Sequence, residues 1–300
     1  MIQSPLNYIG GKFKLLPQIL PLFPNNIHTF VDLFCGGANV GINVNCKSVI
    51  LNDINQYIIG IIKTFKELEK KEIFENINNI ISKFNLSDVS KNGYDFYGCN
   101  SSNGVGQYNK NAFLKLKKYF NQLQIINNQY YIILYVLIVY SFNNQIRFNK
   151  KGEFNLPVGK RDFNTKMQKK LNDFIDRLKQ IDCKFSSFDF CNINITDKND
   201  FVYVDPPYLI TCATYNEQGG WNEIIEKSLY NYLDSLNLQG IKFALSNVLS
   251  SKGKINYILR DWLDKNHQFT CHHLNYNYSN SNYQTSGRLL GSDEVLITNY

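Results

Sequence analysis

The segment Phe201–Tyr208, F-V-Y-V-D-P-P-Y, joins four apolar residues to an acid, two prolines and a tyrosine. The apolar run predicts a buried strand that ends at Asp205, and Pro206 and Pro207 have no backbone N–H. A carbonyl of Asp205 or Pro206 is therefore left to accept hydrogen bonds beside the Asp205 carboxylate. Two such acceptors suit an exocyclic amino group, which has two N–H donors, and Tyr208 offers a flat face on which a base can stack. A stiff turn that ends the strand explains the prolines, but it does not explain the acid and the aromatic ring.

A second candidate site follows the apolar run 29–34, which ends in the glycine turn C-G-G. Glycine lets a ligand approach the backbone closely because it has no Cβ. The next apolar run, 48–53, ends in Asp53, which lies 21 positions after Asp32 (53 − 32) and so has the spacing of an acid that binds ribose hydroxyls. Cys35 stands where the first glycine of G-x-G-x-x-G would be, which favours an adenosine-type ligand other than a dinucleotide. Taken alone, the pattern is also consistent with a structural tight turn.

Strands and helices are expected to alternate along most of the chain. Apolar runs predict strands at 29–34, 48–53, 184–188, 201–205, 242–246, 270–278 and 294–298. Helical spacing predicts helices at 56–84, 111–123, 130–142, 165–181, 222–236 and 255–265. This alternation predicts an α/β layered fold with a mostly parallel sheet. Ligands bind such sheets at the carboxyl ends of the strands, where Asp53 and Asp205 are expected.

Residues 57–162 interrupt the alternation and are expected to form a helical insertion. They include a stretch rich in Gly, Asn, Ser and Tyr at 92–109, which predicts a loop, and a polar, basic stretch at 143–162. On its own, the basic stretch is consistent with an ordinary solvated loop. The predicted organisation is a discontinuous domain of residues 1–56 and 163–300, with the insertion between them.

Composition limits the class of protein. Hydrophobic residues make up 44% of 300 residues, which is enough for a full core, and the formal net charge of +7 favours a polyanionic partner without excluding an enzyme with surplus lysines. Seven cysteines without a C-x-x-C pair indicate a reducing compartment, so a cytoplasmic protein is expected.

No membrane segment and no metal site are expected. The start, M-I-Q-S-P-L-N-Y, lacks the pattern of a signal peptide, and the most apolar run, 130–142, is shorter than the roughly 20 residues of a membrane helix. His272, His273 and the cysteines lack metal-ligand spacing, and His28 and His267 are most simply surface or core residues.

The motifs together resemble those of amino-methyltransferases that use S-adenosylmethionine. N-Y-I-G-G-K at 7–12 precedes D-L-F-C-G-G at 32–37, and D-P-P-Y at 205–208 follows an insertion. This order resembles the DNA adenine methyltransferase (Dam) family, and its T-even phage branch most closely. The likeness covers nearly the whole chain, including S-F-N-N-Q-I-R-F-N-K-K-G-E-F-N-L-P-V-G-K-R at 141–161 and G-I-K-F-A-L-S-N-V-L at 240–249. A longer stretch around residues 87–110 is the main departure.

The resemblance implies a Rossmann-like class I S-adenosylmethionine-dependent methyltransferase sheet with an inserted, mainly helical target-recognition domain at 57–162. Its base-reading loop would span 142–161. The implied reaction is methyl transfer from S-adenosylmethionine to adenine N6 in double-stranded DNA, with the adenine flipped out of the duplex and S-adenosylhomocysteine as product. The implied target is GATC. Gln145 departs from the family pattern, because the family usually has an apolar residue at this position. A cognate restriction endonuclease is kept as a candidate partner.

The resemblance also assigns roles to individual residues. The catalytic residues would be Asp205, Pro206, Pro207 and Tyr208. The cofactor-binding residues would be Tyr8, Lys12, Asp32, Phe34, Gly36, Asp53, Phe188, Asp189 and Asp205. The DNA-binding residues would be Lys12, Phe142, Asn143, Gln145, Arg147, Asn149, Pro157 and Arg161. Among the last set, Arg147 would bind a guanine through its two acceptors, and Phe142 and Asn143 would fill the space left by the flipped base.

In the implied reaction, Asp205 and the Pro206 carbonyl accept hydrogen bonds from N6 and localise its lone pair, so that positioning and electrostatics suffice. Three alternatives remain open. The same amine chemistry suits cytosine N4, and it also suits a protein glutamine or a small amine, although such enzymes commonly carry N-P-P-Y and need no basic loop. The third alternative is a non-catalytic DNA-binding protein that kept the fold.

Overall fold

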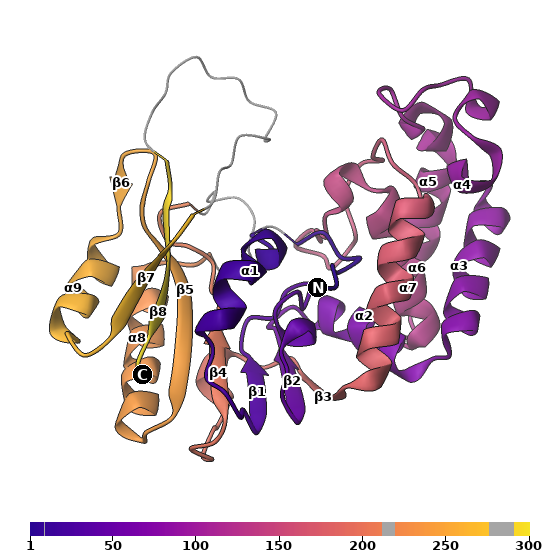
Figure 1. Cartoon of the computed structure of the whole chain (residues 1–300). Coiled ribbons are helices and arrows are strands. Elements are labelled where there is room, and N and C mark those ends of the chain that lie inside the picture. The colour runs from indigo at the N-terminus through magenta and orange to yellow at the C-terminus, as the bar shows by residue number, and fades with distance from the viewer. Residues whose placement is uncertain (9, 212–219, 276–290) are drawn as a thin grey trace. The chain divides into compact units, whose positions relative to one another are not determined.

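The computed structural model describes all residues except 9, 212–219 and 276–290 (Figure 1). The chain forms two compact units, each discontinuous in sequence. The first, called the helical unit, consists of Met1–Gly11, Gly36–Asn43 and Asn55–Phe185, and the second, called the sheet unit, consists of Lys12–Cys35, Val44–Ile54 and Ser186–Tyr300. The predicted insertion at 57–162 falls within the helical unit.

The sheet is mixed and its central strands are parallel, which confirms the predicted α/β architecture with a mostly parallel sheet. Its strands are β1 (Thr29–Asp32), β2 (Ser48–Asn52), β3 (Asp182–Ser186), β4 (Phe201–Val204), β5 (Lys242–Ser251), β6 (Lys254–Ile255), β7 (Thr270–Leu274) and β8 (Asp293–Thr298). The order is β3-β2-β1-β4-β5-β8-β7, and β6 pairs with β5. β2, β1, β4 and β5 are parallel neighbours, whereas β8 runs antiparallel to both β5 and β7.

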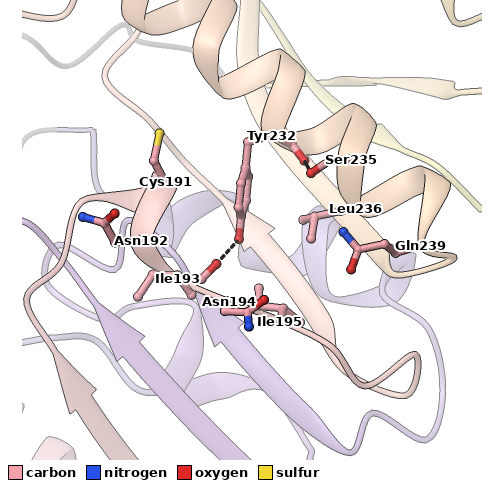
Figure 2. Close-up of a pocket in the computed structure, with 9 residues that line it drawn as sticks. All are labelled: Cys191, Asn192, Ile193, Asn194, Ile195, Tyr232, Ser235, Leu236 and Gln239. Carbon is pink, nitrogen blue, oxygen red and sulfur yellow. Dashed lines mark hydrogen bonds between the residues drawn. The ribbon is translucent and has the colours of Figure 1, made fainter.

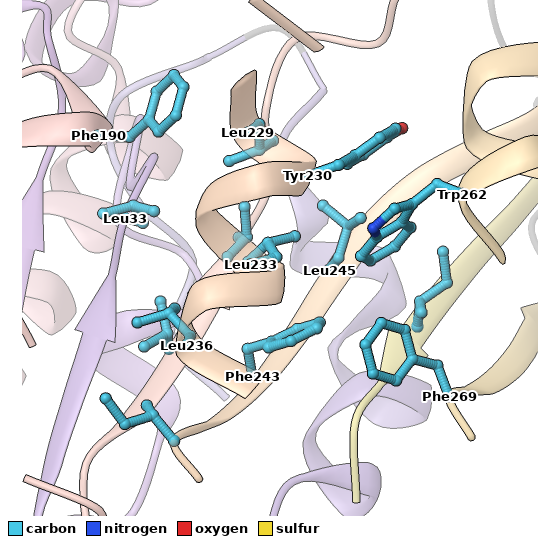
Figure 3. Close-up of a cluster of buried hydrophobic side chains, with 14 of the residues drawn as sticks. Leu33, Phe190, Leu229, Tyr230, Leu233, Leu236, Phe243, Leu245, Trp262 and Phe269 are labelled. Atoms are coloured by element: carbon cyan, nitrogen blue, oxygen red, sulfur yellow. The ribbon is translucent and has the colours of Figure 1, made fainter. Parts of the chain in front are cut away.

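Both faces of the central strands are buried, because apolar residues occupy both alternating sets of positions. β4 is buried at every residue. The helices of the sheet unit are α1 (Leu16–Ile19), α8 (Glu223–Leu238) and α9 (Tyr257–Lys265), with short 3-10 turns η1 (Lys12–Leu15), η2 (Leu20–Leu22) and η6 (Phe190–Asn192). In Figure 3, leucines of α8 lie beside Phe243 and Leu245 of β5, and Trp262 of α9 completes the cluster.

The helical unit is built around one helix that is buried on nearly all sides. Its elements are η3 (Gly41–Asn43), α2 (Gln56–Glu67), α3 (Lys70–Phe84), α4 (Val89–Asn92), η4 (Asp95–Tyr97), α5 (Gly106–Asn121), α6 (Asn128–Tyr140), η5 (Phe142–Asn144) and α7 (Thr165–Gln180). α6 contacts α2, α3 and α5. It carries the apolar run that the sequence indicated as core, and no described helix is long and apolar enough to cross a membrane.

Asparagine begins most of the long helices in both units. The side chains of Asn55, Asn127, Asn164, Asn222 and Asn256 each accept a hydrogen bond from a backbone N–H in the first turn of α2, α6, α7, α8 and α9. Such caps satisfy donors that the helix itself leaves unpaired. The high asparagine content therefore has a direct structural use.

Several predicted boundaries are corrected by the structure, including the helix expected at 255–265, which begins at Tyr257 because Lys254–Ile255 form β6. The helix expected at 56–84 is interrupted where Leu68 and Glu69 adopt extended backbone. The loop expected at 92–109 contains η4, and α5 begins inside it at Gly106. β5 continues past Ser246 because β6 and β8 supply backbone partners there. β7 ends at Leu274, and residues 276–278 of the predicted strand lie outside the described residues.

Candidate active site

Three predicted acids meet at one edge of the sheet. β1, β2 and β4 are parallel, so their carboxyl ends lie together. Asp32 ends β1, Asp53 directly follows β2, and Asp205 directly follows β4. Asp32 and Asp53 are buried, whereas the Asp205 side chain is 17% exposed. This edge is where α/β sheets bind ligands.

The buried amide of Asn52 ties this edge together. Its Nδ2 donates to the carbonyl oxygens of Leu33 and Phe188, each at 3.0 Å. Its Oδ1 accepts from the Phe188 N–H at 3.0 Å and from Ser186 Oγ at 2.8 Å. The side chain thus uses both donors and both acceptor positions. Sequence reasoning missed Asn52, because most of its partners are main-chain atoms of distant segments.

Apolar surface is exposed beside Asp53. Ile54 is 69% exposed and Phe188 is 57% exposed, although both are large hydrophobic residues. Exposed apolar side chains next to a buried carboxylate suit a ligand that combines a flat ring with hydroxyl groups. Phe188 is a predicted cofactor residue, whereas Ile54 was missed, because an isoleucine after a strand is not distinguishable from a core residue by type.

An aromatic cluster surrounds Phe34, another predicted cofactor residue. The Phe34 ring lies 5.6 Å from the Phe190 ring and 5.8 Å from the Trp221 ring, which it meets edge-on. The indole N–H of Trp221 donates to the buried carboxylate of Glu226. This hydrogen bond fixes Trp221, which sequence reasoning also missed.

The catalytic candidate Asp205 lies in a group with Lys12, Tyr208 and Glu294, here called the acid cluster. Lys12 Nζ is 2.9 Å from Asp205 Oδ1 and 3.5 Å from Glu294 Oε1. The Tyr208 hydroxyl lies 3.1 Å from each of the same two oxygens, and Lys12 Nζ lies 4.8 Å from the centre of the Tyr208 ring. Lys12 is only 4% exposed, so it is a buried member of this cluster and not a solvated surface lysine.

The acid cluster shifts the protonation equilibria of its members. Burial raises the pKa of the Asp205 carboxyl, the Lys12 ammonium opposes this rise, and the Glu294 carboxylate adds to it. Burial, together with the carboxylates of Asp205 and Glu294, raises the pKa of the Tyr208 phenol well above its ordinary value. Tyr208 therefore remains a neutral hydrogen-bond donor toward the two acids.

Glu294 reaches this group because its strand runs against the others. In the β5–β8 pair, Glu294 lies opposite Val248 and Ile297 lies opposite Leu245. An antiparallel strand begins at the edge where its parallel neighbours end, so the start of β8 lies at the ligand edge. The only signal in the sequence is an acid within the apolar run D-E-V-L-I-T, and this acid is 1% exposed.

The remaining predicted cofactor and catalytic residues occupy defined positions. In the helical unit, Gly36 has a φ of +46°, and a Cβ there would lie 2.7 Å from Cδ1 of Tyr8, so only glycine fits. In the sheet unit, the exposed Asp189 side chain accepts the backbone hydrogen bond that begins η6. Pro206 is buried and Pro207 is partly buried directly after β4.

Six of the eight predicted DNA-binding residues lie on a hairpin that follows α6 in the helical unit, here called the reading hairpin (141–158). Arg161 comes just after this hairpin, and Lys12 belongs to the acid cluster of the sheet unit. An antiparallel bridge pairs Phe148 with Phe154. The Phe148 ring also stacks on Tyr57, with ring centroids 3.9 Å apart. One side of the hairpin is thus anchored by aromatic packing.

Most of the predicted reading side chains are open to solvent. Phe142, Asn143, Arg147, Pro157 and Arg161 are exposed, while Gln145 and Asn149 are partly buried. Arg147 Nε donates to Asn155 Oδ1 at 2.8 Å, which holds the guanidinium on the hairpin. Asn149 Oδ1 accepts from the N–H groups of Lys151 and Glu153 and so shapes the tip.

The sheet unit has a pocket of about 270 Å³ between α8 and residues 191–195 (Figure 2). Its lining includes Cys191, Ile193 and Tyr232, and the Tyr232 hydroxyl donates to the Ile193 carbonyl at 2.9 Å. None of the predicted site residues lines it, so it does not compete with the strand edge as the site of chemistry.

One group of potential metal ligands is present among the described residues. Ligand atoms of His28, Asp197 and Asp200 lie within 4.8 Å of one another. His28 precedes β1 and the two acids precede β4, so the group lies at the amino ends of these strands, opposite the acid cluster. His28 Nδ1 lies 3.6 Å from an oxygen of each acid.

A mostly parallel α/β sheet with acids and aromatic side chains at the carboxyl ends of its strands is an arrangement typical of proteins that bind nucleotide-like ligands. The family model for D12 class N6 adenine-specific DNA methyltransferases matches residues 8–280. The chain belongs to this family. The predicted resemblance to DNA adenine methyltransferases is thereby confirmed at the level of the family.

Three relatives are similar over nearly the whole chain. The type II methyltransferase M.FokI of Planomicrobium okeanokoites is 43% identical over 100% of the chain, and the modification methylase StsI of Streptococcus sanguinis is 42% identical over 100%. The modification methylase LlaI of Lactococcus lactis subsp. lactis is 32% identical over 99%. The chain spans 43% of the length of each of these relatives.

Proposed function

We propose that the protein transfers a methyl group from S-adenosylmethionine to adenine N6 in double-stranded DNA. The observation that carries this proposal is the acid cluster, which places Asp205 directly after β4 at the ligand edge and joins it to Lys12, Tyr208 and Glu294. The family and the names of the relatives, which are modification methylases, support the same reaction.

The chain's contribution to the reaction is positioning and electrostatics. The N6 lone pair of adenine is delocalised into the ring and is a poor nucleophile. The Asp205 carboxylate and the Pro206 carbonyl accept hydrogen bonds from the two N–H groups of N6. These hydrogen bonds localise the lone pair on the nitrogen. Methyl transfer would break the methyl–sulfur bond of the sulfonium and leave S-adenosylhomocysteine as a neutral thioether. The positive charge passed to N6 would be stabilised by the carboxylates of Asp205 and Glu294 until a proton leaves N6 to solvent.

The residues at the edge fit S-adenosylmethionine, which supplies an activated methyl group on a sulfonium. Asp53 is a buried carboxylate suited to two ribose hydroxyls, and Ile54 and Phe188 offer the apolar surface that a purine needs. Acidic side chains nearby also suit a cationic sulfur. The adenine of the DNA must leave the duplex to be methylated, at a cost of a few kcal/mol.

Sequence recognition is assigned to the insertion at 57–162, with the reading hairpin as its base-contacting part. The likeness to the T-even phage branch of the Dam family makes GATC the target to test first, with a cognate restriction endonuclease as candidate partner. Long-read modification sequencing of DNA from a methylation-free host that expresses the chain is the direct test. N6-methyladenine at one short motif is expected, and its absence would overturn the proposal.

Arg147→Ala is expected to relax the preference at one base pair. A bidentate arginine–guanine contact is worth about 1–3 kcal/mol of discrimination, and Arg147 is exposed on the reading hairpin. The measurement is kcat/KM on the target duplex and on duplexes with each base pair changed. Lys150→Ala, an exposed cation of the same hairpin, is the matched control. An equal loss on every duplex would assign Arg147 to phosphate contact instead.

Trp221 is expected to report cofactor binding by fluorescence. The chain has two tryptophans, of which Trp221 packs on Phe34 and Trp262 is buried in the core. Adding S-adenosylhomocysteine should change the emission of the parent and of Trp262→Phe, but not that of Trp221→Phe. Calorimetry checks that all three bind. If adding S-adenosylhomocysteine still changes the emission of Trp221→Phe, the ligand does not bind beside Phe34.

A further inference from the structure

Residues 87–109, here called the bracing segment, form the stretch that departs from the family likeness. It comprises α4, η4 and the start of α5. The reaction proposed above makes no use of it. It contacts Tyr140 and Gln168 through Ser87 and Ser90. Beyond α5 itself, most of its other hydrogen bonds to the rest of the helical unit are made with residues 159–162, here called the exit segment, which leads out of the reading hairpin. Both segments belong to the helical unit.

A buried polar network joins the two ends of the bracing segment to Asp162. Ser87 Oγ donates to Asp162 Oδ2 at 2.9 Å and accepts from Asn109 Nδ2 at 2.9 Å. The Ser87 N–H donates to Asn109 Oδ1, and the Val89 N–H donates to Asp162 Oδ2, each at 2.8 Å. Ser87, Asn109 and Asp162 are at most 1% exposed. A buried network of this kind specifies one arrangement, because breaking it leaves polar groups without partners.

The two backbones also meet directly. The Val105 N–H donates to the Lys160 carbonyl at 3.0 Å. Gly104 has a φ of +70°, and a Cβ there would lie 2.2 Å from the Lys160 carbonyl oxygen. A Cβ on Gly106 would lie 2.7 Å from the Gly159 carbonyl oxygen. No side chain therefore fits at position 104 or 106, where the bracing segment meets the backbone of the exit segment.

Arg161, the predicted DNA contact next to Asp162, is held by the same segment. Its Nη1 donates to the Ser101 carbonyl at 2.9 Å and to the Tyr94 hydroxyl at 3.4 Å. The bracing segment contains two acids and one lysine, so it offers little attraction to phosphate itself. We therefore expect the segment to affect DNA binding through Arg161 and the hairpin.

We propose that the bracing segment positions Arg161 and the exit end of the reading hairpin, and thereby sets how sharply the enzyme discriminates between base pairs. This inference rests on the proposed function. The residues of the segment are positioning residues. Disturbing them should raise KM for DNA and reduce the ratio of kcat/KM between the target duplex and a singly altered duplex. The affinity for the cofactor should stay unchanged.

Gly104→Ala tests the inference, with Gly98→Ala as its matched control. Both glycines lie in the bracing segment with positive φ, +70° and +63°, so an alanine strains the backbone similarly at both. A Cβ at Gly98 meets nothing within 4 Å, whereas one at Gly104 forces the Lys160 carbonyl away. Gly104→Ala should raise KM for the target duplex about tenfold and reduce the preference over a singly altered duplex. In Gly98→Ala, KM for the target duplex and the preference over a singly altered duplex should both stay within about twofold of the parent values.

The Kd for S-adenosylhomocysteine separates a local effect from a damaged fold. It should be unchanged in Gly104→Ala, and unchanged KM and discrimination in that variant would overturn the inference. If Gly104→Ala loses cofactor binding, Ser87→Ala decides, with the exposed Ser102→Ala as control. Parent-like discrimination in Ser87→Ala would then overturn the inference. If the parent methylates no duplex, the proposed function fails and the inference fails with it.

Discussion

Asp205→Ala is expected to lower kcat for adenine methylation by about 10³-fold, with little change in the Kd for S-adenosylhomocysteine. Removing one preorganised group that stabilises developing charge costs roughly 10²–10³ in kcat. Asp205 is also the acceptor that localises the N6 lone pair in the proposed reaction, which sets the expectation at the upper end. Single-turnover methylation of a duplex by excess enzyme measures the chemical step directly. Full activity in this variant would remove Asp205 from the reaction.

Asp205→Asn shows whether the loss is chemical or structural. The fold raises the pKa of Asp205 above its ordinary value. A raised folded pKa contributes stability at pH values below the unfolded pKa, and this contribution is lost as the pH rises through the folded pKa. The ionised carboxylate therefore contributes no stability near neutral pH through this shift. In Asp205→Asn, Lys12 keeps the Glu294 carboxylate as a partner 3.5 Å away, so this variant should melt within a few degrees of the parent while its methylation rate stays low.

Lys12→Met is expected to reduce both stability and activity. Lys12 is the cation paired with Asp205 and Glu294 in the acid cluster, and it is 4% exposed. Removing one partner of a buried ion pair costs about 3–5 kcal/mol, because the remaining charges are left uncompensated. Denaturant unfolding at neutral pH measures this loss.

The pH dependence of Lys12→Met carries a second signature. Lys12 lowers the pKa of Asp205 and Glu294 raises it, so the acid limb of the rate profile should move to higher pH in Lys12→Met. Adding Glu294→Gln should move that limb part of the way back and recover part of the stability, since one carboxylate then remains instead of two. A profile and a melting curve that match the parent would show that Lys12 does not control the cluster.

Local patterns were enough to predict the edge of the sheet. Asp53 and Asp205 both end apolar runs, and parallel strands bring such ends together, so their meeting at one edge followed from the alternation of strands and helices. The buried helix α6 was visible from its apolar run. The hairpin after it was expected only from the family resemblance, because on its own the basic stretch was consistent with a solvated loop.

Residues that act through distant partners were not predictable in this way. Glu294 joins Asp205 only because β8 is antiparallel, and strand direction is not encoded in its six residues. Asn52 owes its place to main-chain atoms of Leu33 and Phe188. Trp221 packs on Phe34, which is far away in the sequence. The segment at 92–109 appeared as a plain loop, because its value lies in glycines that fit against another backbone.

The clamp formed by Asn52 has a consequence for the entropy of binding. Asn52 bonds both the N–H and the carbonyl of Phe188, while the Phe188 ring stays 57% exposed. An exposed ring on an immobilised backbone loses little conformational freedom when a ligand covers it, and such preorganisation increases the affinity gained from a given contact. If a flexible loop carried the same phenylalanine, the loop would have to become ordered on binding. The conformational entropy lost in that step would offset part of the binding free energy.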